Sequence, residues 1–283
     1  MGNSRQARRG PQRPLRASPW LYAAAVALAV AGAFLGSGAL GGTPIQDAAG
    51  GWLSADGTVL APGTGAFSIW SVIYTGLVVH AVIQLLPAWR GSELQHRLRP
   101  WAAASALLNA VWIWVVQGGQ LLLSVMVIVV LLAVLARTFI LILRTAANGR
   151  TERLVVGTTF GLYLGWVSVA TVANISALLA SRGAQTSDGA TAVVAAAVLA
   201  VAAAIGITLA AATGGRLAPA AALAWGLAWI AVGRLDGGTQ SVPIAWAAGA
   251  AAALVVAGAL VYRVREARAP RHQLAVHHDG GTR

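Results

Sequence analysis

GLYLGWVSVATVANIS, residues 161–176, lies in a long apolar run and yet carries Tyr163, Trp166 and Asn174 among its polar-tipped side chains. With about 100° per residue, these three side chains share one face of a helix. The motif GxxxGxxxG at residues 157–165 falls on the opposite face, and small residues at that spacing let another helix approach closely in a membrane. The stretch therefore predicts a membrane helix with one close-packing face and one face of polar and aromatic groups.

The polar face of this helix has two interpretations. Large polar-tipped groups beside small ones can form a pocket wall, or they can hydrogen-bond to neighbouring helices, at about 0.6 kcal/mol per bond in membranes. Aromatic residues also gather at bilayer interfaces, but Trp166 lies near the middle of its apolar run. Both interpretations turn this face toward the protein interior.

The composition indicates a membrane protein. Of the 283 residues, 58% are hydrophobic and 10% are charged, whereas a soluble domain carries roughly 25% charged residues. Clusters of charge separate apolar runs of about 20 residues, the length that spans a bilayer. We therefore predict an all-α polytopic membrane protein with eight spans, at 20–40, 67–86, 101–117, 121–143, 154–179, 190–212, 217–233 and 244–262.

The arginines predict the orientation. A net charge of +12 would suit a nucleic-acid partner, but the arginines lie in both tails and in every second connection between spans. This pattern fits the positive-inside rule and not a nucleic-acid patch, so we expect both termini in the cytoplasm and no nucleic acid as partner. Arg182 and Arg234 are the exceptions on the outer side.

The spans divide into two groups, because the first five carry most of the polar and aromatic residues at depth. We predict a basic cytoplasmic tail at 1–18, a five-helix bundle at 19–182, an Ala-rich three-helix extension at 183–265 with a structural or assembly role as one option, and a polar tail at 266–283. The basic start and SGALGG at 37–42 would permit a cleaved signal peptide. The first apolar run is longer than a typical signal core, so we expect a retained helix.

The first external loop, about 41–66, is the longest connection and contains Asp47 and Asp56 but no basic residue. A loop of this length in a compact bundle is often a lid over a site. A solvated linker is the equally weighted alternative.

The chain lacks the residues that several kinds of chemistry require. The chain has no cysteine and no lysine, which excludes disulfides, thiolate catalysis and Schiff bases. We place every Asp and Glu in loops or tails, which argues against a proton relay or a metal site within the spans. His80 is the only histidine within a predicted span. We expect its ring to be neutral and hydrogen-bonded to another helix; a role as a haem ligand or a proton-transfer group is the alternative. No distinct catalytic group emerges, so we expect no enzyme, no metal and no required cofactor.

Two further spans carry polar and aromatic faces. Phe67, Trp70 and Tyr74 share one face of the second span, with spacings of three and four residues. Asn109 and Trp112 share a face of the third span. Asn109 lies near mid-span, where an unpaired carboxamide is costly, so it needs a partner on another helix or on a ligand.

Three segments together resemble the TspO/MBR family, also called tryptophan-rich sensory proteins, whose mitochondrial members are the translocator protein (peripheral benzodiazepine receptor). The family's second helix has a Pro-rich entry followed by Phe, Trp and Tyr, as in APGTGAFSIWSVIY, residues 61–74. Its third helix has Leu-Asn and a Trp three residues later, as at 108–112, and its fifth has Tyr, Trp, Ala and Asn, as in YLGWVSVATVAN, residues 163–174. The resemblance covers about residues 19–182. Leu162 stands where the family often has Pro, and Ser68 and Ile69 stand where it often has Gly-Pro.

The resemblance implies a five-helix bundle that binds a planar apolar ligand, such as a porphyrin or haem, in a pocket between helices. It implies a sensory, receptor-like or transport-related role; the alternative that we keep is a facilitative transporter of a neutral or apolar small molecule. The Ala/Gly/Arg bias is typical of a GC-rich bacterial genome, so we expect a multi-pass protein of the bacterial plasma membrane. Gly32 and Gly36 could support a homodimer. The expected ligand-binding residues, from the shared faces and the resemblance together, are Trp70, Tyr74, Asn109, Trp112, Tyr163, Trp166, Ala170 and Asn174.

Overall fold

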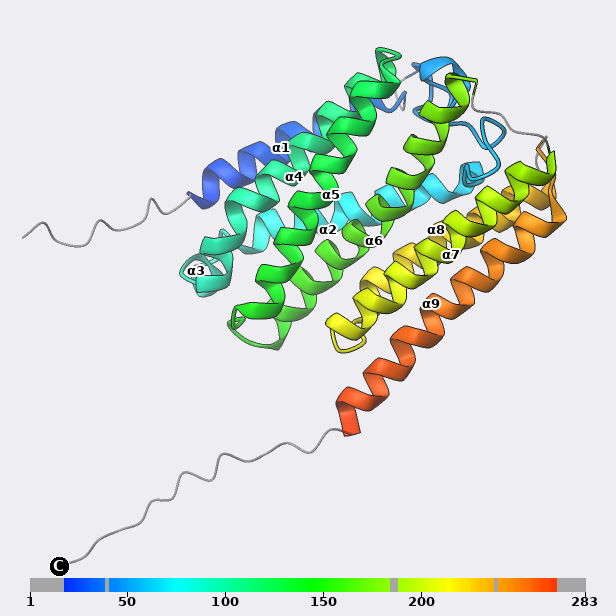
Figure 1. Ribbon diagram of the computed structural model, residues 1–283. Helices are drawn as coiled ribbons and strands as arrows, with labels where there is room; N and C mark the ends of the chain where they lie inside the picture. The colour runs from blue at the N-terminus through cyan, green and yellow to red at the C-terminus, as the bar shows by residue number, and fades with distance from the viewer. Residues whose placement is uncertain (1–17, 39–40, 184–187, 237–238, 269–283) are drawn as a thin grey trace, which may run out of the picture.

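A computed structural model describes residues 18–38, 41–183, 188–236 and 239–268 (Figure 1). Within these residues all regular secondary structure is helical, and eight helices are long and apolar enough to cross a membrane. The prediction of an all-α polytopic membrane protein is confirmed, and each predicted span overlaps one of these helices. Most of the two predicted tails, at 1–18 and 266–283, falls outside the described residues.

The helices follow one another through short connections, with one long loop between the first two. They are α1 (Pro19–Gly36), α2 (Ile69–Ile83), the single turn α3 (Pro87–Arg90), α4 (Glu93–Gln117), α5 (Leu121–Arg144), α6 (Arg150–Ser181), α7 (Asp188–Ala212), α8 (Leu217–Asp236) and α9 (Val242–Arg268). Two 3-10 helices, η1 (Ala49–Gly51) and η2 (Thr64–Ser68), lie in the long loop.

Helix α4 begins eight residues earlier than the apolar pattern predicts. Its first two turns are polar overall, but Leu94 and Leu98 are fully buried and Arg99 is 1% exposed. Burial of this face offsets the cost of Pro100, whose missing N–H removes one helical hydrogen bond. Helix α4 therefore includes residues 93–100, which the apolar pattern predicts to be a connection between spans.

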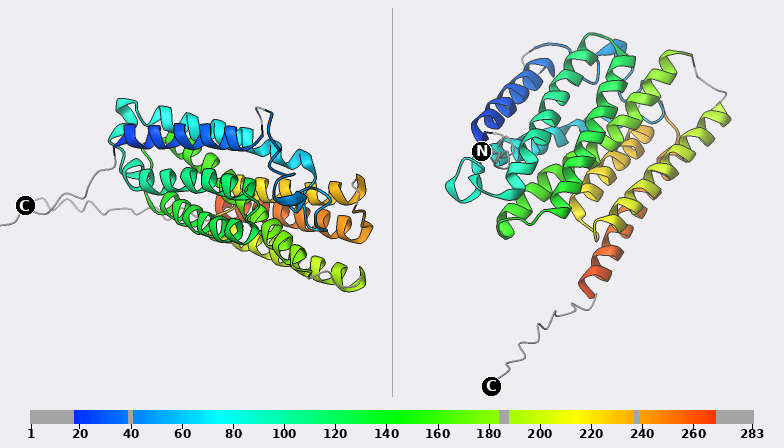
Figure 2. Two further views of the ribbon diagram at one scale, coloured as in Figure 1. Left: turned by 90° about the horizontal axis from the view of Figure 1, so that it is seen from above. Right: turned by 60° about the vertical axis from the view of Figure 1, so that its left-hand side comes forward.

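The helices pack as two adjoining groups (Figures 1 and 2). In the first group α1 packs against α4, α5 lies between α4 and α6, and α2 contacts α6 and α1. In the second group α7 and α8 both pack against α9. Helices α6 and α8 join the groups through one of the most extensive contacts in the molecule. Figure 1 shows that α1 begins and α9 ends at the same end of the helix bundle, opposite the long loop.

The buried apolar side chains form two clusters that interlock. One lies among α1, α2, α4, α5 and α6 and includes Ala222 of α8. The other lies among α7, α8 and α9 and includes Val169 of α6 and Leu60 of the long loop. The division of the chain at residue 182 stays a prediction, since each cluster takes residues from across that boundary.

The glycine motif of α6 packs against α8. A Cβ atom on Gly165 would lie 2.2 Å from the carbonyl oxygen of Pro219, and one on Gly161 would lie 2.9 Å from the Cβ atom of Ala218. The predicted close-packing face is therefore confirmed, and its partner is a helix of the extension. Gly36 likewise packs α1 against Ile113 of α4, which gives it a role within the chain; the homodimer stays a prediction.

Candidate functional site

The centre of the first helix group is an aromatic cluster around Trp70 of α2. Its ring stacks on Tyr74, with centroids 5.3 Å apart and an interplanar angle of 19°. The rings of Tyr163 and Trp166 meet it edge-on at 5.8 and 6.2 Å, and Phe67 meets Trp166 at 5.9 Å. Edge-on and offset contacts are the favoured geometries of aromatic pairs. The faces predicted for α2 and α6 therefore point at each other.

A cavity of about 20 Å³ lies beside this cluster. That volume has room for about one water molecule. The long loop contributes Leu53 and Pro62, so it forms one wall. The other lining residues come from η2 and three helices, and they are Phe67, Trp70, Trp112, Trp166, Ala170, Ala173 and Asn174.

Two polar atoms at the cluster are buried without a hydrogen-bond partner among the described residues. They are the indole Nε1 of Trp166 and the side-chain oxygen of Asn109. The amide nitrogen of Asn109 donates to the hydroxyl of Tyr74 at 2.8 Å, so this side chain is half satisfied. Buried polar groups are nearly always paired, and one free donor and one free acceptor here have the chemistry of a ligand site.

Asn174 differs from Asn109 because its polar atoms are engaged within the protein. Its side-chain oxygen accepts from Trp112 Nε1 at 3.2 Å and from Ser124 Oγ at 3.1 Å. Its amide nitrogen donates to the carbonyl of Ala170 at 2.8 Å. Asn174 thus ties α6 to α4 and α5, as the helix-packing interpretation requires.

The structure brings five of the predicted ligand-binding residues to the cavity wall, namely Trp70, Trp112, Trp166, Ala170 and Asn174. Tyr74 and Asn109 lie behind Trp70, and Tyr163 donates to the carbonyl of Ser105 at 3.0 Å. Sequence reasoning missed Leu53, Pro62 and Ser124. No periodic signal marks loop residues, and a serine on an apolar helix becomes visible only through its partner.

We expect Asn174→Ala to destabilise the fold and Asn109→Ala to change it little. The first substitution leaves the buried indole N–H of Trp112 without a partner, which costs about 1–3 kcal/mol. The second removes only the bond to Tyr74, worth about 0.6 kcal/mol in a membrane. Thermal unfolding in detergent measures both, and equal midpoints for the two variants would contradict this distinction.

The long loop is packed against the protein. Leu53, Leu60, Ala61 and Ala66 are each at most 6% exposed. A solvated linker would leave such side chains in water, so the linker interpretation is wrong. The loop closes the cavity at the end of the bundle where α2 begins and α4 and α6 end.

A second buried polar cluster lies at the other end of the bundle. His80 Nδ1 and the Tyr22 hydroxyl share a hydrogen bond at 2.7 Å, and His80 Nε2 donates to the side-chain oxygen of Gln95 at 2.8 Å. Gln95 in turn donates to Glu152 Oε1 at 3.0 Å. Nε2 carries a proton because the Gln95 oxygen can only accept, and in a neutral imidazole Nδ1 then accepts from Tyr22. The expectation that His80 hydrogen-bonds to another helix is confirmed.

Glu152 corrects the prediction that every carboxylate lies in a loop or tail. It is fully buried in the first turn of α6, where its other oxygen accepts from the backbone N–H of Asn148. Helix α6 begins at Arg150, four residues before the predicted span. The N-terminus of a helix favours a negative side chain, so this position accommodates the carboxylate.

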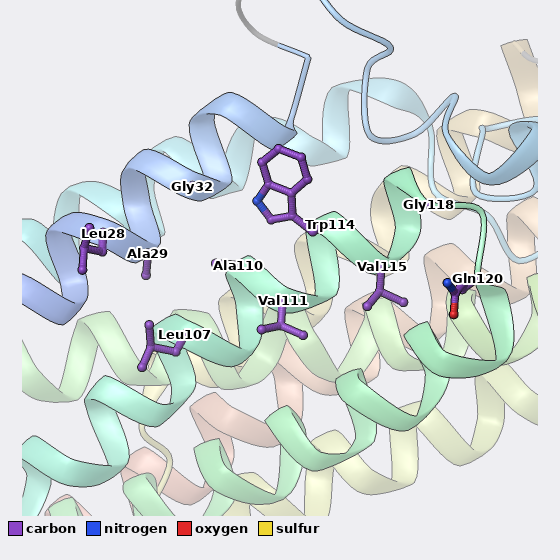
Figure 3. Close-up of a pocket in the computed structure, with 10 residues that line it drawn as sticks. All are labelled: Leu28, Ala29, Gly32, Leu107, Ala110, Val111, Trp114, Val115, Gly118 and Gln120. Carbon is purple, nitrogen blue, oxygen red and sulfur yellow. The ribbon is translucent and has the colours of Figure 1, made fainter.

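A larger hollow lies elsewhere in the described structure. It is an open groove of about 490 Å³ between α1 and α4, lined by Leu28, Gly32, Val111 and Trp114 among others (Figure 3). Trp114 is 55% exposed, as expected from its direction opposite Trp112. The groove contains no buried polar group that could orient a ligand, and its apolar wall suits lipid chains.

An enclosed polar and aromatic site inside a bundle of apolar spans defines a polytopic α-helical membrane protein with a candidate ligand pocket. A family model of TSPO-like proteins matches residues 20–261, and the chain belongs to this family. The match continues past residue 182 through α7, α8 and most of α9, beyond the region in which sequence motifs show the resemblance. Comparisons with curated proteins and with solved structures gave no match.

Proposed function

We propose that this protein is a receptor or sensor of the bacterial plasma membrane, which binds a planar apolar ligand of the tetrapyrrole type beside Trp70 and Trp166. The observation that carries the proposal is the pair of unpartnered buried atoms, Trp166 Nε1 and Asn109 Oδ1, at a cluster of aromatic rings. Ring faces stack on a planar ligand, while one donor and one acceptor fix its orientation.

The size of the cavity limits how such a ligand can enter. Pockets for small molecules usually measure about 300–1,000 Å³, and this cavity measures about 20 Å³. Phe67, Leu53 and Pro62 form the side of the wall that belongs to η2 and the loop. We propose that these residues move away when the ligand binds and that the Trp70 ring turns, so that the ligand also reaches Asn109 behind it. A porphyrin or haem then fits the chemistry of the site after the loop has moved.

Titration of the purified protein with protoporphyrin IX tests this proposal, with quenching of Trp fluorescence as the signal. We expect Trp166→Phe to weaken binding about 5- to 150-fold, since it keeps a ring but removes the N–H donor, a loss of about 1–3 kcal/mol. Asn109→Ala should weaken binding by a similar factor because it removes the free acceptor.

Trp114→Phe is the matched control, because Trp114 lies in the open groove and not at the cavity. Its affinity for protoporphyrin should equal that of the unsubstituted protein. If Trp114→Phe weakens binding and Trp166→Phe does not, the ligand occupies the groove and the proposed pocket is wrong.

A facilitative transporter is the second candidate, and one observation favours it. Buried polar groups continue from the cavity toward the opposite end of the bundle, where Phe160, one turn from Tyr163, contacts His80 at 5.3 Å. His80 then connects through Gln95 to Glu152. Flux of protoporphyrin across proteoliposomes separates the candidates, since a receptor binds the ligand without moving it across the membrane.

A further inference from the structure

The loop over the cavity is attached to α8, a helix of the extension. Arg234, near the outer end of α8, is fully buried and points its guanidinium group into the loop. It donates to the carbonyl oxygens of Thr58 at 3.0 Å and of Ala55, and its Nη2 lies 3.5 Å from that of Ala61. One side chain therefore holds the backbone of the loop at three points between Leu53 and Pro62, the two loop residues that line the cavity.

Two tryptophans of α8 hold the end of the loop that enters α2. Trp225 Nε1 donates to the carbonyl of Ala66 at 3.0 Å, and the backbone N–H of Gly63 donates to the carbonyl of Trp229 at 2.9 Å. The Trp229 ring covers Gly65 so closely that a Cβ atom there would lie 2.1 Å from it. Loop and helix are thus fitted to each other over the whole stretch that covers the cavity.

The residues after α8 add a further attachment. The Thr239 hydroxyl donates to the backbone carbonyl of Asp56 at 3.0 Å, and its backbone N–H donates to the Asp56 side chain at 3.3 Å. Both contacts join residues 183 positions apart in the chain. Within the described residues, the loop has no comparably dense set of polar contacts with the helices of the first group.

We propose that α8 is the latch of the pocket, and that Arg234 is a positioning residue that keeps the loop closed over the cavity. Opening the pocket requires the loop to leave α8, because Arg234 binds the backbone between Leu53 and Pro62, and Trp225 binds it again at Ala66. The extension thereby sets how often the pocket opens. The inference rests on the proposed function of the cavity as a ligand site, but the movement of the loop is measurable without a ligand.

The absence of cysteine from the chain makes a direct measurement practical. Leu53→Cys places a single thiol on the cavity side of the loop, and reaction with a hydrophilic maleimide reports how often the loop opens. We expect Arg234→Gln to raise the labelling rate on the order of tenfold or more, because it removes several hydrogen bonds from a charged donor. Arg97→Gln, an exposed arginine of α4, should leave the rate unchanged.

Ala248→Cys is the internal control for general loosening. Ala248 of α9 is fully buried and is not one of the residues that hydrogen-bond to the loop. Under the proposal its labelling stays slow in the Arg234→Gln background while Leu53→Cys reacts faster. An unchanged rate at Leu53→Cys, or equal increases at both thiols, would overturn the latch.

Trp225→Phe provides a second test of the proposal in case Arg234→Gln does not fold. This variant keeps an aromatic ring but removes the indole N–H that binds Ala66, so we expect a severalfold faster reaction at Leu53→Cys. Trp246→Phe, whose indole is 76% exposed on α9, is its matched control. Equal rates in these two variants would overturn the proposal.

The rate at which protoporphyrin IX associates with the same variants tests the role of α8 separately from the identity of the ligand. If loop opening limits entry, Arg234→Gln and Trp225→Phe bind protoporphyrin faster than their controls. Faster thiol labelling without any porphyrin binding would support the latch and contradict the proposed ligand. Normal porphyrin binding with unchanged labelling rates would support the ligand site and contradict the latch.

Discussion

Gly165→Ala is expected to be among the most destabilising single substitutions in this protein. The added Cβ atom would lie 2.2 Å from the carbonyl oxygen of Pro219 and 3.0 Å from the Cβ atom of Ala222. The nearest obstacle is backbone, so no side-chain rotation relieves the clash and α6 and α8 must separate. Overpacking costs about 1–3 kcal/mol, and about 2–4 °C of unfolding midpoint accompanies each kcal/mol in a protein of roughly this size. Thermal unfolding in detergent measures the effect.

Gly249→Ala is the matched control for Gly165→Ala. Gly249 lies within α9, and a Cβ atom there would meet nothing within 4 Å. Alanine is favoured over glycine in a helix interior by about 1 kcal/mol, so this variant should be as stable as the unsubstituted protein or more so. If Gly165→Ala unfolds at the same temperature as Gly249→Ala, the close contact between α6 and α8 is wrong.

The two faces of α6 have different partners, and this links the extension to the candidate pocket. Gly161 and Gly165 bring α8 against one face, while Trp166 and Asn174 line the cavity on the other. The same helix α8 carries Arg234, which holds the loop. A substitution at the glycine face should therefore change the labelling of the loop as well as the stability of the fold.

The spans and their faces could be predicted from the sequence because they follow from local patterns. Apolar runs of bilayer length identify helices whatever their neighbours are, and helical periodicity places Trp166 and Asn174 on one face. The same periodicity separates Trp112, which is buried, from Trp114, which is 55% exposed. Each of these results depends on residues within a few turns of one another.

The remaining features could not be predicted because they depend on contacts between distant segments. Arg234 looked like an exception to the positive-inside rule, but its position is explained by loop carbonyls 173 to 179 residues away. Glu152 looked like a loop residue until Gln95, 57 positions earlier, provided a hydrogen-bond donor. The sequence shows that such groups are unusual, but it does not show which partner satisfies them.

Glu152→Ala is expected to have a second large effect, at the end of the bundle opposite the pocket. The fully buried carboxylate accepts from the Gln95 side chain and from the backbone N–H of Asn148. Hydrogen bonds to charged groups contribute about 1.5–3 kcal/mol each, and alanine leaves both donors without an acceptor. Loss of the negative charge at the start of α6 removes a further 0.3–1 kcal/mol or so. We therefore expect a loss of about 3 kcal/mol or more of unfolding free energy.

Glu152→Gln separates the loss of the hydrogen bonds from the loss of the negative charge. Glutamine keeps the shape and one acceptor oxygen but removes the charge, so it should cost less than alanine and still unfold below the unsubstituted protein. Glu93→Gln is the control, because Glu93 also lies in the first turn of a helix but its side chain is 64% exposed. It should change the midpoint by no more than an exposed ion pair would, about 0–1 kcal/mol. If Glu152→Ala proves as mild as Glu93→Gln, the carboxylate does not hold α6 to α4, and the network from Tyr22 through His80 does not depend on it.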